Sequence, residues 1–118
     1  MLKPEDTFEI IANVGTSEMD LKPVHGTSSQ VPTKKYARKI YAIILVEKSG
    51  SANTLTVKIY KSDGSTLDRS FDIKLAANEV KTIISKPDAP ILTVYAGEYL
   101  KAVAASASVE VIMDAYDL

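Results

Sequence analysis

Short stretches of alternating apolar and polar residues run through this chain, and turn residues separate them. The last quarter shows the pattern clearly, because the small residues Ser106-Ala107-Ser108 separate an apolar-rich stretch at 99–105 from an alternating stretch that begins at Val109. Alternation with a period of two places one face of a strand on a core. Turns about every 8–12 residues are typical of sandwiches and barrels. The sequence therefore predicts an all-β fold, an antiparallel two-sheet β-sandwich of about eight strands, Ig-like or jelly-roll.

The strongest local signal is the dipeptide Asp63-Gly64, which lies between two alternating stretches. Glycine accepts the positive φ that a tight hairpin turn requires, so the stretches on either side are expected to pair as a hairpin. Applying the same alternation to the whole chain predicts which side chains lie inside the sandwich. These are Phe8, Ile10, Ile40, Ile44, Leu55, Val57, Ile59, Phe71, Ile73, Val109, Val111 and Met113.

Composition narrows the class of protein. With 118 residues, 46% hydrophobic and 25% charged, the chain has the usage of one ordinary globular domain. The net charge of −1 provides no basic field, so we expect no nucleic-acid partner. The absence of cysteine excludes disulfides and thiolate chemistry. The longest apolar run, Ile40–Val46, is too short to cross a membrane, and the first residues lack the apolar run of a signal peptide.

The N-terminal part differs from the rest in composition. Residues 1–35 are expected to form one strand and an extended arm or loop, and residues 36–118 to form the sandwich core of a single structural domain. The stretch 15–35 is polar and interrupted by proline and glycine, so it should order on a partner. Met19, Leu21 and Val24 are spaced to add a strand to an exposed sheet edge, and they form the predicted partner-binding arm.

No residue cluster predicts catalysis. The only histidine, His25, has no nucleophile or carboxylate near it in the sequence, and a zinc site without cysteine would need mostly carboxylates. Carboxylates that share a strand face, such as Glu110 and Asp114, are expected to be solubilising, although a glycosidase pair between strands is an alternative. We therefore expect no enzyme, no catalytic residue, no metal and no cofactor.

Two groups of cations need an explanation. The basic cluster Lys34, Lys35, Arg38 and Lys39 is expected to be the solvated start of a strand, although it could also meet phosphates or an acidic partner. Arg69 falls on the apolar side of its strand. It either extends its charged end into solvent or pairs across a subunit interface.

The stretch 39–47 is apolar on both sides, which is unusual for a sandwich strand. If its even-numbered residues from 40 to 46 face the core, then its odd-numbered apolar residues face outward. Ile83, Ile112 and Tyr116 repeat this anomaly elsewhere. Such a patch predicts self-association, unless the arm or a loop covers it within one chain. The predicted oligomer interface consists of Tyr41, Ile43, Leu45, Ile83, Ile112 and Tyr116.

A set of turn and strand motifs resembles a known group of proteins. The motifs are Arg38-Lys39-Ile40-Tyr41, Leu55-Thr56-Val57-Lys58-Ile59-Tyr60, Ala77-Asn78-Glu79, Ala96-Gly97-Glu98 and Ala105-Ser106-Ala107-Ser108-Val109-Glu110-Val111. Their order resembles small β-sandwich virion structural proteins of phages and related prokaryotic viruses, which serve as capsid decorations, head fibres or tail-associated components.

The resemblance implies a non-enzymatic structural protein of the virion, made in the host cytoplasm. It implies a homo-oligomer, with a trimer slightly favoured, that docks on a capsid or tail protein. The residues themselves leave a second class open, a cellular adhesion or carbohydrate- or ligand-binding β-sandwich module.

Overall fold

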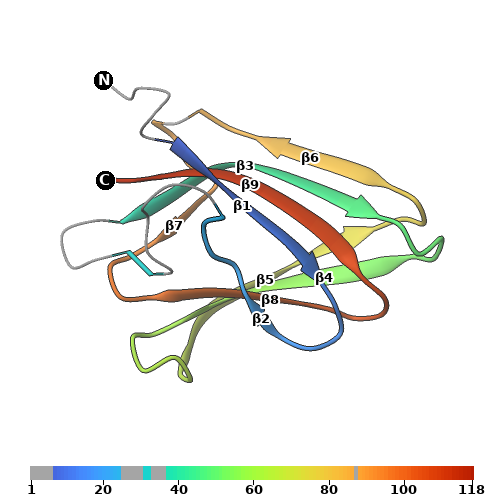
Figure 1. Ribbon diagram of the computed structural model, residues 1–118, viewed down its shortest axis with the longest axis horizontal. Coiled ribbons are helices and arrows are strands. Elements are labelled where there is room, and N and C mark those ends of the chain that lie inside the picture. Colours follow the sequence, from blue (N-terminus) through green and yellow to red (C-terminus); the bar gives the residue numbers. More distant parts are fainter. Residues whose placement is uncertain (1–6, 25–30, 33–36, 87) are drawn as a thin grey trace.

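Two antiparallel sheets pack against each other in the computed structural model, which describes residues 7–24, 31–32, 37–86 and 88–118 (Figure 1). The first sheet contains β1 (Thr7–Val14), β9 (Val109–Asp117), β3 (Arg38–Glu47), β6 (Val80–Ile84) and β7 (Leu92–Val94). Its strand order is β1-β9-β3-β6, and β7 pairs with β3. The second sheet has the order β2-β8-β4-β5 and contains β2 (Met19–Asp20), β8 (Tyr99–Ala104), β4 (Asn53–Tyr60) and β5 (Leu67–Leu75). The predicted all-β two-sheet architecture is confirmed.

The predicted hairpin joins β4 to β5 around Asp63-Gly64. Gly64 adopts a φ of 74°, as the turn requires. The carboxylate of Asp63 accepts the backbone N–H groups of Ser65 at 2.9 Å and Thr66 at 2.8 Å, and also the hydroxyl of Thr66. One side chain therefore satisfies three donors of the turn, and backbone bonds from Lys61 to Thr66 and from Gly64 to Lys61 complete it.

Acid should remove the stabilisation that Asp63 gives to this turn. The hydroxyl and N–H of Thr66, together with the N–H of Ser65, lower the pKa of Asp63 from 3.8 to about 2. A carboxyl with a lowered pKa stabilises the fold above its unfolded pKa, and this contribution is lost as the pH falls through the folded pKa. We expect the melting-temperature difference between wild type and Asp63→Ala to shrink between pH 3.8 and about 2. Thermal denaturation followed by circular dichroism measures it, and a difference that stays constant over this range would contradict the role of Asp63.

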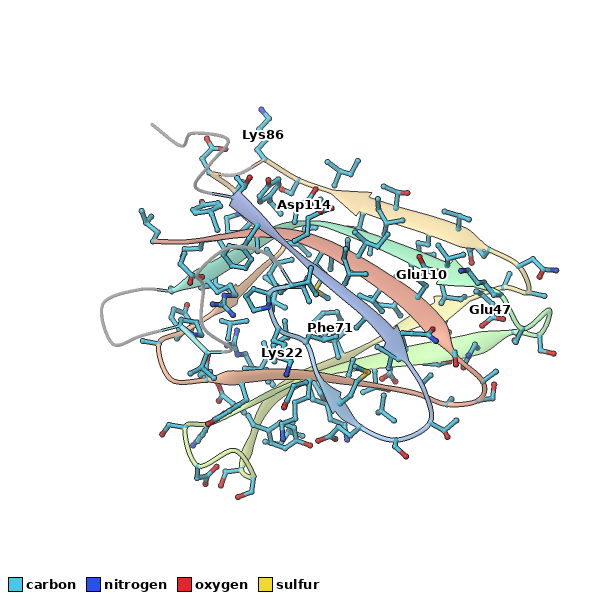
Figure 2. All side chains as sticks on the ribbon, viewed as in Figure 1. Lys22, Glu47, Phe71, Lys86, Glu110 and Asp114 are labelled. Carbon is cyan, nitrogen blue, oxygen red and sulfur yellow. The ribbon has the colours of Figure 1, made fainter. Side chains whose placement is uncertain are left out.

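The core lies between the sheets and is lined by apolar side chains from both inner faces. Nearly all the predicted core residues are buried, including Ile10, Val57 and Met113 at 0% exposure. Phe71 is half-buried and packs against the core between the two sheets (Figure 2). Ile44 is the exception, because its side chain points away from the core.

A β-bulge in β3 explains the position of Ile44. The register of β3 against β9 shifts between Ile40 and Ala42, so Tyr41 is an extra residue on β3. An extra residue exchanges the two faces of all the residues that follow it. The expectation that Ile44 and Val46 face the core is therefore wrong, as is the expectation that Ile43 and Leu45 face outward, whereas Ala42 next to the bulge is buried at 9% exposure. Ile43 and Leu45 are both 0% exposed and lie in the core.

Each end of the core closes on a buried polar group. At one end the guanidinium of Arg38, which is 1% exposed, donates to both carboxylate oxygens of Asp117 at 2.8 and 2.9 Å. At the other end Glu47, also 1% exposed, accepts the amide of Asn53 at 3.1 Å and the N–H and hydroxyl of Ser49. The Ser49 and Asn53 donors outweigh burial and lower the pKa of Glu47.

The N-terminal segment belongs to the sandwich, in contrast to the predicted arm. β1 pairs with β9, and β2 adds a strand to β8 of the same chain, with Met19 opposite Ala102. Leu21 is 1% exposed, and its N–H donates to the carbonyl of Leu100 at 2.9 Å. Val24 is 45% exposed, but its N–H donates to the carbonyl of Glu9 at 3.1 Å. The arm prediction is therefore wrong for Gly15–Val24, because apolar anchors fix this stretch to the chain's own sheets. Residues 25–30 and 33–35 of the predicted arm lie outside the described residues.

Candidate functional site

The outward side of the first sheet carries a row of isoleucines. The register places Ile11 opposite Ile112 and Ile112 opposite Ile44, so three neighbouring strands each contribute one isoleucine. On one side of this row Val46 lies opposite Val80, and on the other side Ala42 lies opposite Ile84. We call Ile11, Ile44, Val46, Val80, Ile84 and Ile112 the apolar outer face.

This surface is more exposed than a core and more apolar than an ordinary outer surface. Ile84 is 73% exposed, Val80 is 62% exposed and Ile11 is 42% exposed, whereas Ile44 and Ile112 are half-buried by their neighbours. The solvated side of an antiparallel sheet usually carries polar residues. A contiguous exposed apolar patch marks an interaction surface. The apolar outer face is therefore the candidate functional site of this chain.

The predicted interface residues divide into two groups. Tyr41 and Ile112 face outward, and Tyr116 lies on the same side but is 7% exposed because it packs against Tyr41, with the ring centroids 6.1 Å apart. Ile43, Leu45 and Ile83 instead point inward, where Ile83 packs against the core, so their placement in an exposed patch is wrong. The bulge moves the first two, and the alternation of β6 around Ile83 moves the third.

Sequence reasoning missed five residues of the apolar outer face, although some carried a signal. Ile11 interrupts the alternation between Ile10 and Ala12, which indicates a strand that is apolar on both sides. Val80 and Ile84 share the side opposite to Ile83. Nothing in the sequence around Ile44 and Val46 indicates their orientation, because an all-apolar strand has no pattern that a bulge would break.

Two carboxylates lie beside the isoleucine row. Glu9 and Asp114 are directly opposite each other on β1 and β9, one register step from Ile11 and Ile112 (Asp114 is labelled in Figure 2). Like charges at such positions repel each other. Burial, and then the charge of Glu9, raise the pKa of Asp114. The carboxylates of Glu9 and Asp114 could form ion pairs with basic groups of a partner, or bind protons in acid.

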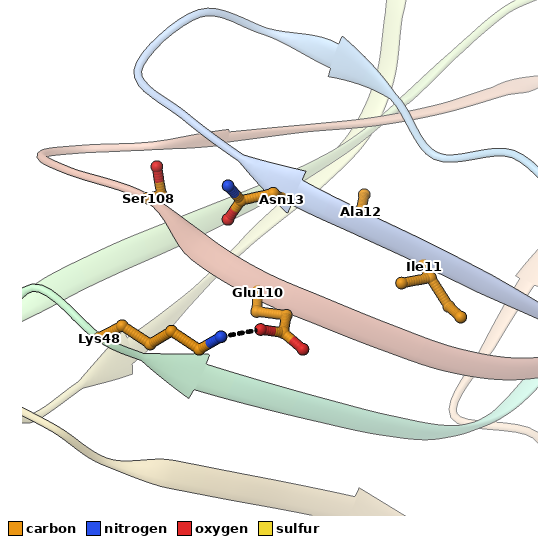
Figure 3. Close-up of a pocket in the computed structure, with 6 residues that line it drawn as sticks. All are labelled: Ile11, Ala12, Asn13, Lys48, Ser108 and Glu110. Carbon is orange, nitrogen blue, oxygen red and sulfur yellow. Dashed lines mark ion pairs between the residues drawn. The ribbon is translucent and has the colours of Figure 1, made fainter.

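An open hollow lies at the far end of the same surface. Its volume is about 440 Å³, and it is lined by Ile11, Ala12, Asn13, Lys48, Ser108 and Glu110 (Figure 3). The ammonium of Lys48 pairs with the carboxylate of Glu110 across it. The hollow therefore lies between polar side chains, such as those of Lys48 and Glu110, and Ile11 of the apolar outer face.

The outward side of the second sheet has the opposite character. Glu18 accepts the phenol hydroxyl of Tyr60 at 2.8 Å and the ammonium of Lys58 at 3.1 Å. The ammonium of Lys101 lies 5.1 Å from the ring centre of Tyr60 and 5.9 Å from that of Tyr99. Charged and aromatic groups on this surface satisfy one another, as expected of a solvated sheet face.

The remaining sequence candidates take structural roles. Arg38 of the basic cluster is buried against Asp117, and the ammonium of Lys39 contacts the hydroxyl of Thr93 at 3.5 Å. Lys34 and Lys35, like His25, lie outside the described residues. Arg69 pairs within its own chain, since it donates to Glu98 at 2.7 Å and to the carbonyl of Thr93 at 3.0 Å.

Within the described part of the chain, no group of three His, Cys, Asp or Glu side chains is placed to hold a metal ion. The same part of the chain contains no helix long and apolar enough to cross a membrane.

No protein-family model and no curated protein matches the sequence. Among solved structures, the fold is similar to that of the SPP1 Dit (gp 19.1) protein, described as a paradigm of the hub adsorption apparatus in phages that infect Gram-positive bacteria. The TM-score is 0.42 and the sequence identity is 13%. The match covers 92% of this chain and 47% of that protein, so the present chain spans about half of its length.

Proposed function

We propose that this chain is a non-enzymatic structural protein of a viral particle, in which copies associate through the apolar outer face. The apolar outer face carries the self-association part of the proposal, because aliphatic side chains of four strands, β1, β9, β3 and β6, are exposed or half-buried on it. The viral part follows from the resemblance of the strand and turn motifs to small virion sandwich proteins. On this proposal the chain is made in the host cytoplasm, becomes part of the virion and docks there on a capsid or tail protein.

Burial between copies explains the composition of this surface. Transfer of aliphatic surface out of water contributes roughly 25 cal/mol for each Å². Ile44 and Ile112 lie at the centre of the patch, and the charged groups Glu9, Asp114 and Glu110 lie beside it on β1 and β9. An apolar centre with a polar rim is the usual anatomy of a protein interface.

A second candidate function is a carbohydrate- or ligand-binding module. The observation that favours it is the pair of tyrosines Tyr60 and Tyr99, which lie opposite each other on the outward side of the second sheet with Lys101 above both rings. Aromatic faces beside hydrogen-bonding groups can bind planar or sugar-like ligands. This candidate places function on the second sheet and leaves the first sheet's apolar surface without a role.

A paired substitution tests the proposed interface. Ile44→Glu with Ile112→Lys introduces two charges at directly opposite outward positions, so association through the apolar outer face should be lost and the mass of the oligomer should fall. The matched control is Thr56→Lys with Val103→Glu, at directly opposite outward positions of the second sheet, and it should leave the assembly unchanged. Light scattering coupled to size exclusion at micromolar concentration measures the mass. A wild-type monomer, or an oligomer that is indifferent to the first pair, would overturn the proposal.

A further inference from the structure

β6 is the outermost strand of the first sheet beyond β3, and its hydrogen-bonding pattern can be assigned residue by residue (Figure 1). The N–H of Glu47 donates to the carbonyl of Glu79 at 2.9 Å, and the N–H of Ser85 donates to the carbonyl of Tyr41 at 2.7 Å. In an antiparallel ladder, hydrogen-bonded and non-bonded pairs alternate. The odd-numbered residues of β6 therefore direct their backbone groups to β3, and Val80, Thr82 and Ile84 direct theirs away from it.

These outward backbone groups form an open edge. Among the described residues, no backbone hydrogen bond outside the strand ladders involves Val80, Thr82 or Ile84, and β6 pairs with β3 alone. The side chains of Val80 and Ile84 are also the most exposed members of the apolar outer face. Val80 and Ile84 thus offer both outward backbone groups and exposed apolar side chains, and Thr82 between them offers its outward backbone groups.

The edges at β5, β2 and β1 are charged, short or partly covered. β5 carries Asp68, Asp72 and Lys74 on its exposed side, and β2 is only two residues long. Pro23 bridges to Ile10, which covers part of the edge of β1. Charges, short strands and coverage are the ways in which proteins prevent edge-to-edge pairing. β6 has one charge, Lys81, but its ammonium reaches toward the second sheet and donates to the carbonyl of Lys74 on β5 at 2.6 Å.

We propose that β6 pairs antiparallel with β6 of a second copy, across a two-fold axis at Thr82. The five residues Val80-Lys81-Thr82-Ile83-Ile84 are self-complementary in this register. Thr82 lies opposite Thr82 of the second copy, and Val80 lies opposite Ile84 of the second copy. Each of these pairs exchanges both N–H and C=O bonds, because these residues direct their backbone groups outward.

This arrangement has a clear consequence for the surface. It joins two first sheets into one continuous sheet and brings two apolar outer faces side by side, with the Val80 and Ile84 side chains in contact across the axis. The inference rests on the self-association in the proposed function, but it depends on the backbone of β6 rather than on the side chains of Ile44 and Ile112. The two contacts can therefore fail separately. It also replaces the expected trimer with an assembly built from two-fold pairs.

Thr82→Pro tests the pairing directly. Proline removes the N–H of Thr82, which the β3 ladder does not use, and edge strands tolerate proline at such a position. The control Thr82→Val keeps both the N–H and the branched side chain. By light scattering, wild type and Thr82→Val should have the same mass and Thr82→Pro half of it. A folded Thr82→Pro that keeps the wild-type mass would overturn the proposal.

A crosslink keeps the proposal testable if Thr82→Pro fails to fold. The chain has no cysteine, so Thr82→Cys would carry a single thiol. Residues paired across the axis have Cα atoms about 5.5 Å apart, a separation that a disulfide spans. Mild oxidation should convert Thr82→Cys to a covalent dimer, and the control Thr56→Cys on the second sheet should remain uncrosslinked. Equal crosslinking of the two variants would contradict the β6 contact.

The outcomes separate this inference from the proposed function. If Ile44→Glu with Ile112→Lys keeps the wild-type mass while Thr82→Pro halves it, the face contact is wrong and the β6 pairing holds. If the reverse is found, the β6 pairing is wrong and the face contact holds. A wild-type monomer overturns both.

Discussion

Leu45→Ala is expected to destabilise the fold by about 2–5 kcal/mol, whereas Ile44→Ala, one residue earlier, should cost less than about 1 kcal/mol. Leu45 is 0% exposed and lies in the core, so its truncation leaves a cavity there. Ile44 points away from the core and can be truncated without one. Urea unfolding measures both losses, as a fall in the midpoint with an unchanged m value.

The difference between the two variants tests the bulge at Tyr41. Without the bulge, the alternation that begins at Ile40 would continue and Ile44 would be the core residue. A larger loss for Ile44→Ala than for Leu45→Ala would therefore contradict the register shift. Association adds a concentration-dependent term to apparent stability, so unfolding is measured at several protein concentrations. The loss for Leu45→Ala should not depend on concentration, because its side chain contacts only its own chain.

The comparison of sequence with structure shows which patterns are informative. Strands with one apolar side and one polar side, such as β4, were predicted with their core residues, because only one orientation buries the apolar side. β3 is apolar on both sides, so either orientation buries similar surface and the sequence gives no preference. Its orientation is decided by the one-residue bulge at Tyr41, which the pairing with β9 reveals.

The sequence predicted that an apolar surface would be exposed, but it predicted only some of the residues that form this surface. A strand with two apolar sides implies an uncovered apolar surface whichever side faces inward, and the apolar outer face has this origin. The predicted arm failed for a different reason. The segment 15–24 is polar on average, but Leu21 is buried in the core, Met19 packs against the core, and backbone bonds to β8 and β1 hold the segment in place. The average composition of a segment does not show whether individual apolar residues within it are buried.

Removal of the Arg38 guanidinium is expected to have the other large effect. Arg38 is the first residue of β3 and Asp117 is the last residue of β9, so these residues are far apart in the sequence but lie opposite each other in the sheet. The guanidinium donates to both carboxylate oxygens at 2.8 and 2.9 Å and lies 4.9 Å from the ring centre of Phe8. We expect Arg38→Ala to cost at most about 3–5 kcal/mol, because it leaves the carboxylate of Asp117, whose side chain is 20% exposed, without its partner. Denaturant unfolding measures this loss.

A double-mutant cycle separates the charge pair from simple packing. If the cost of Arg38→Ala comes from the stranded carboxylate, then Arg38→Met with Asp117→Leu should recover most of the stability, since a well-packed apolar pair can replace a buried ion pair. Arg38→Lys keeps the charge but loses the two-pronged donor geometry, so it should fall between wild type and Arg38→Ala. If Arg38→Met and the double variant are equally unstable, the stranded charge is not the cause. The end of the sandwich would then depend on the shape of the arginine, which fills the space between Asp117 and the ring of Phe8.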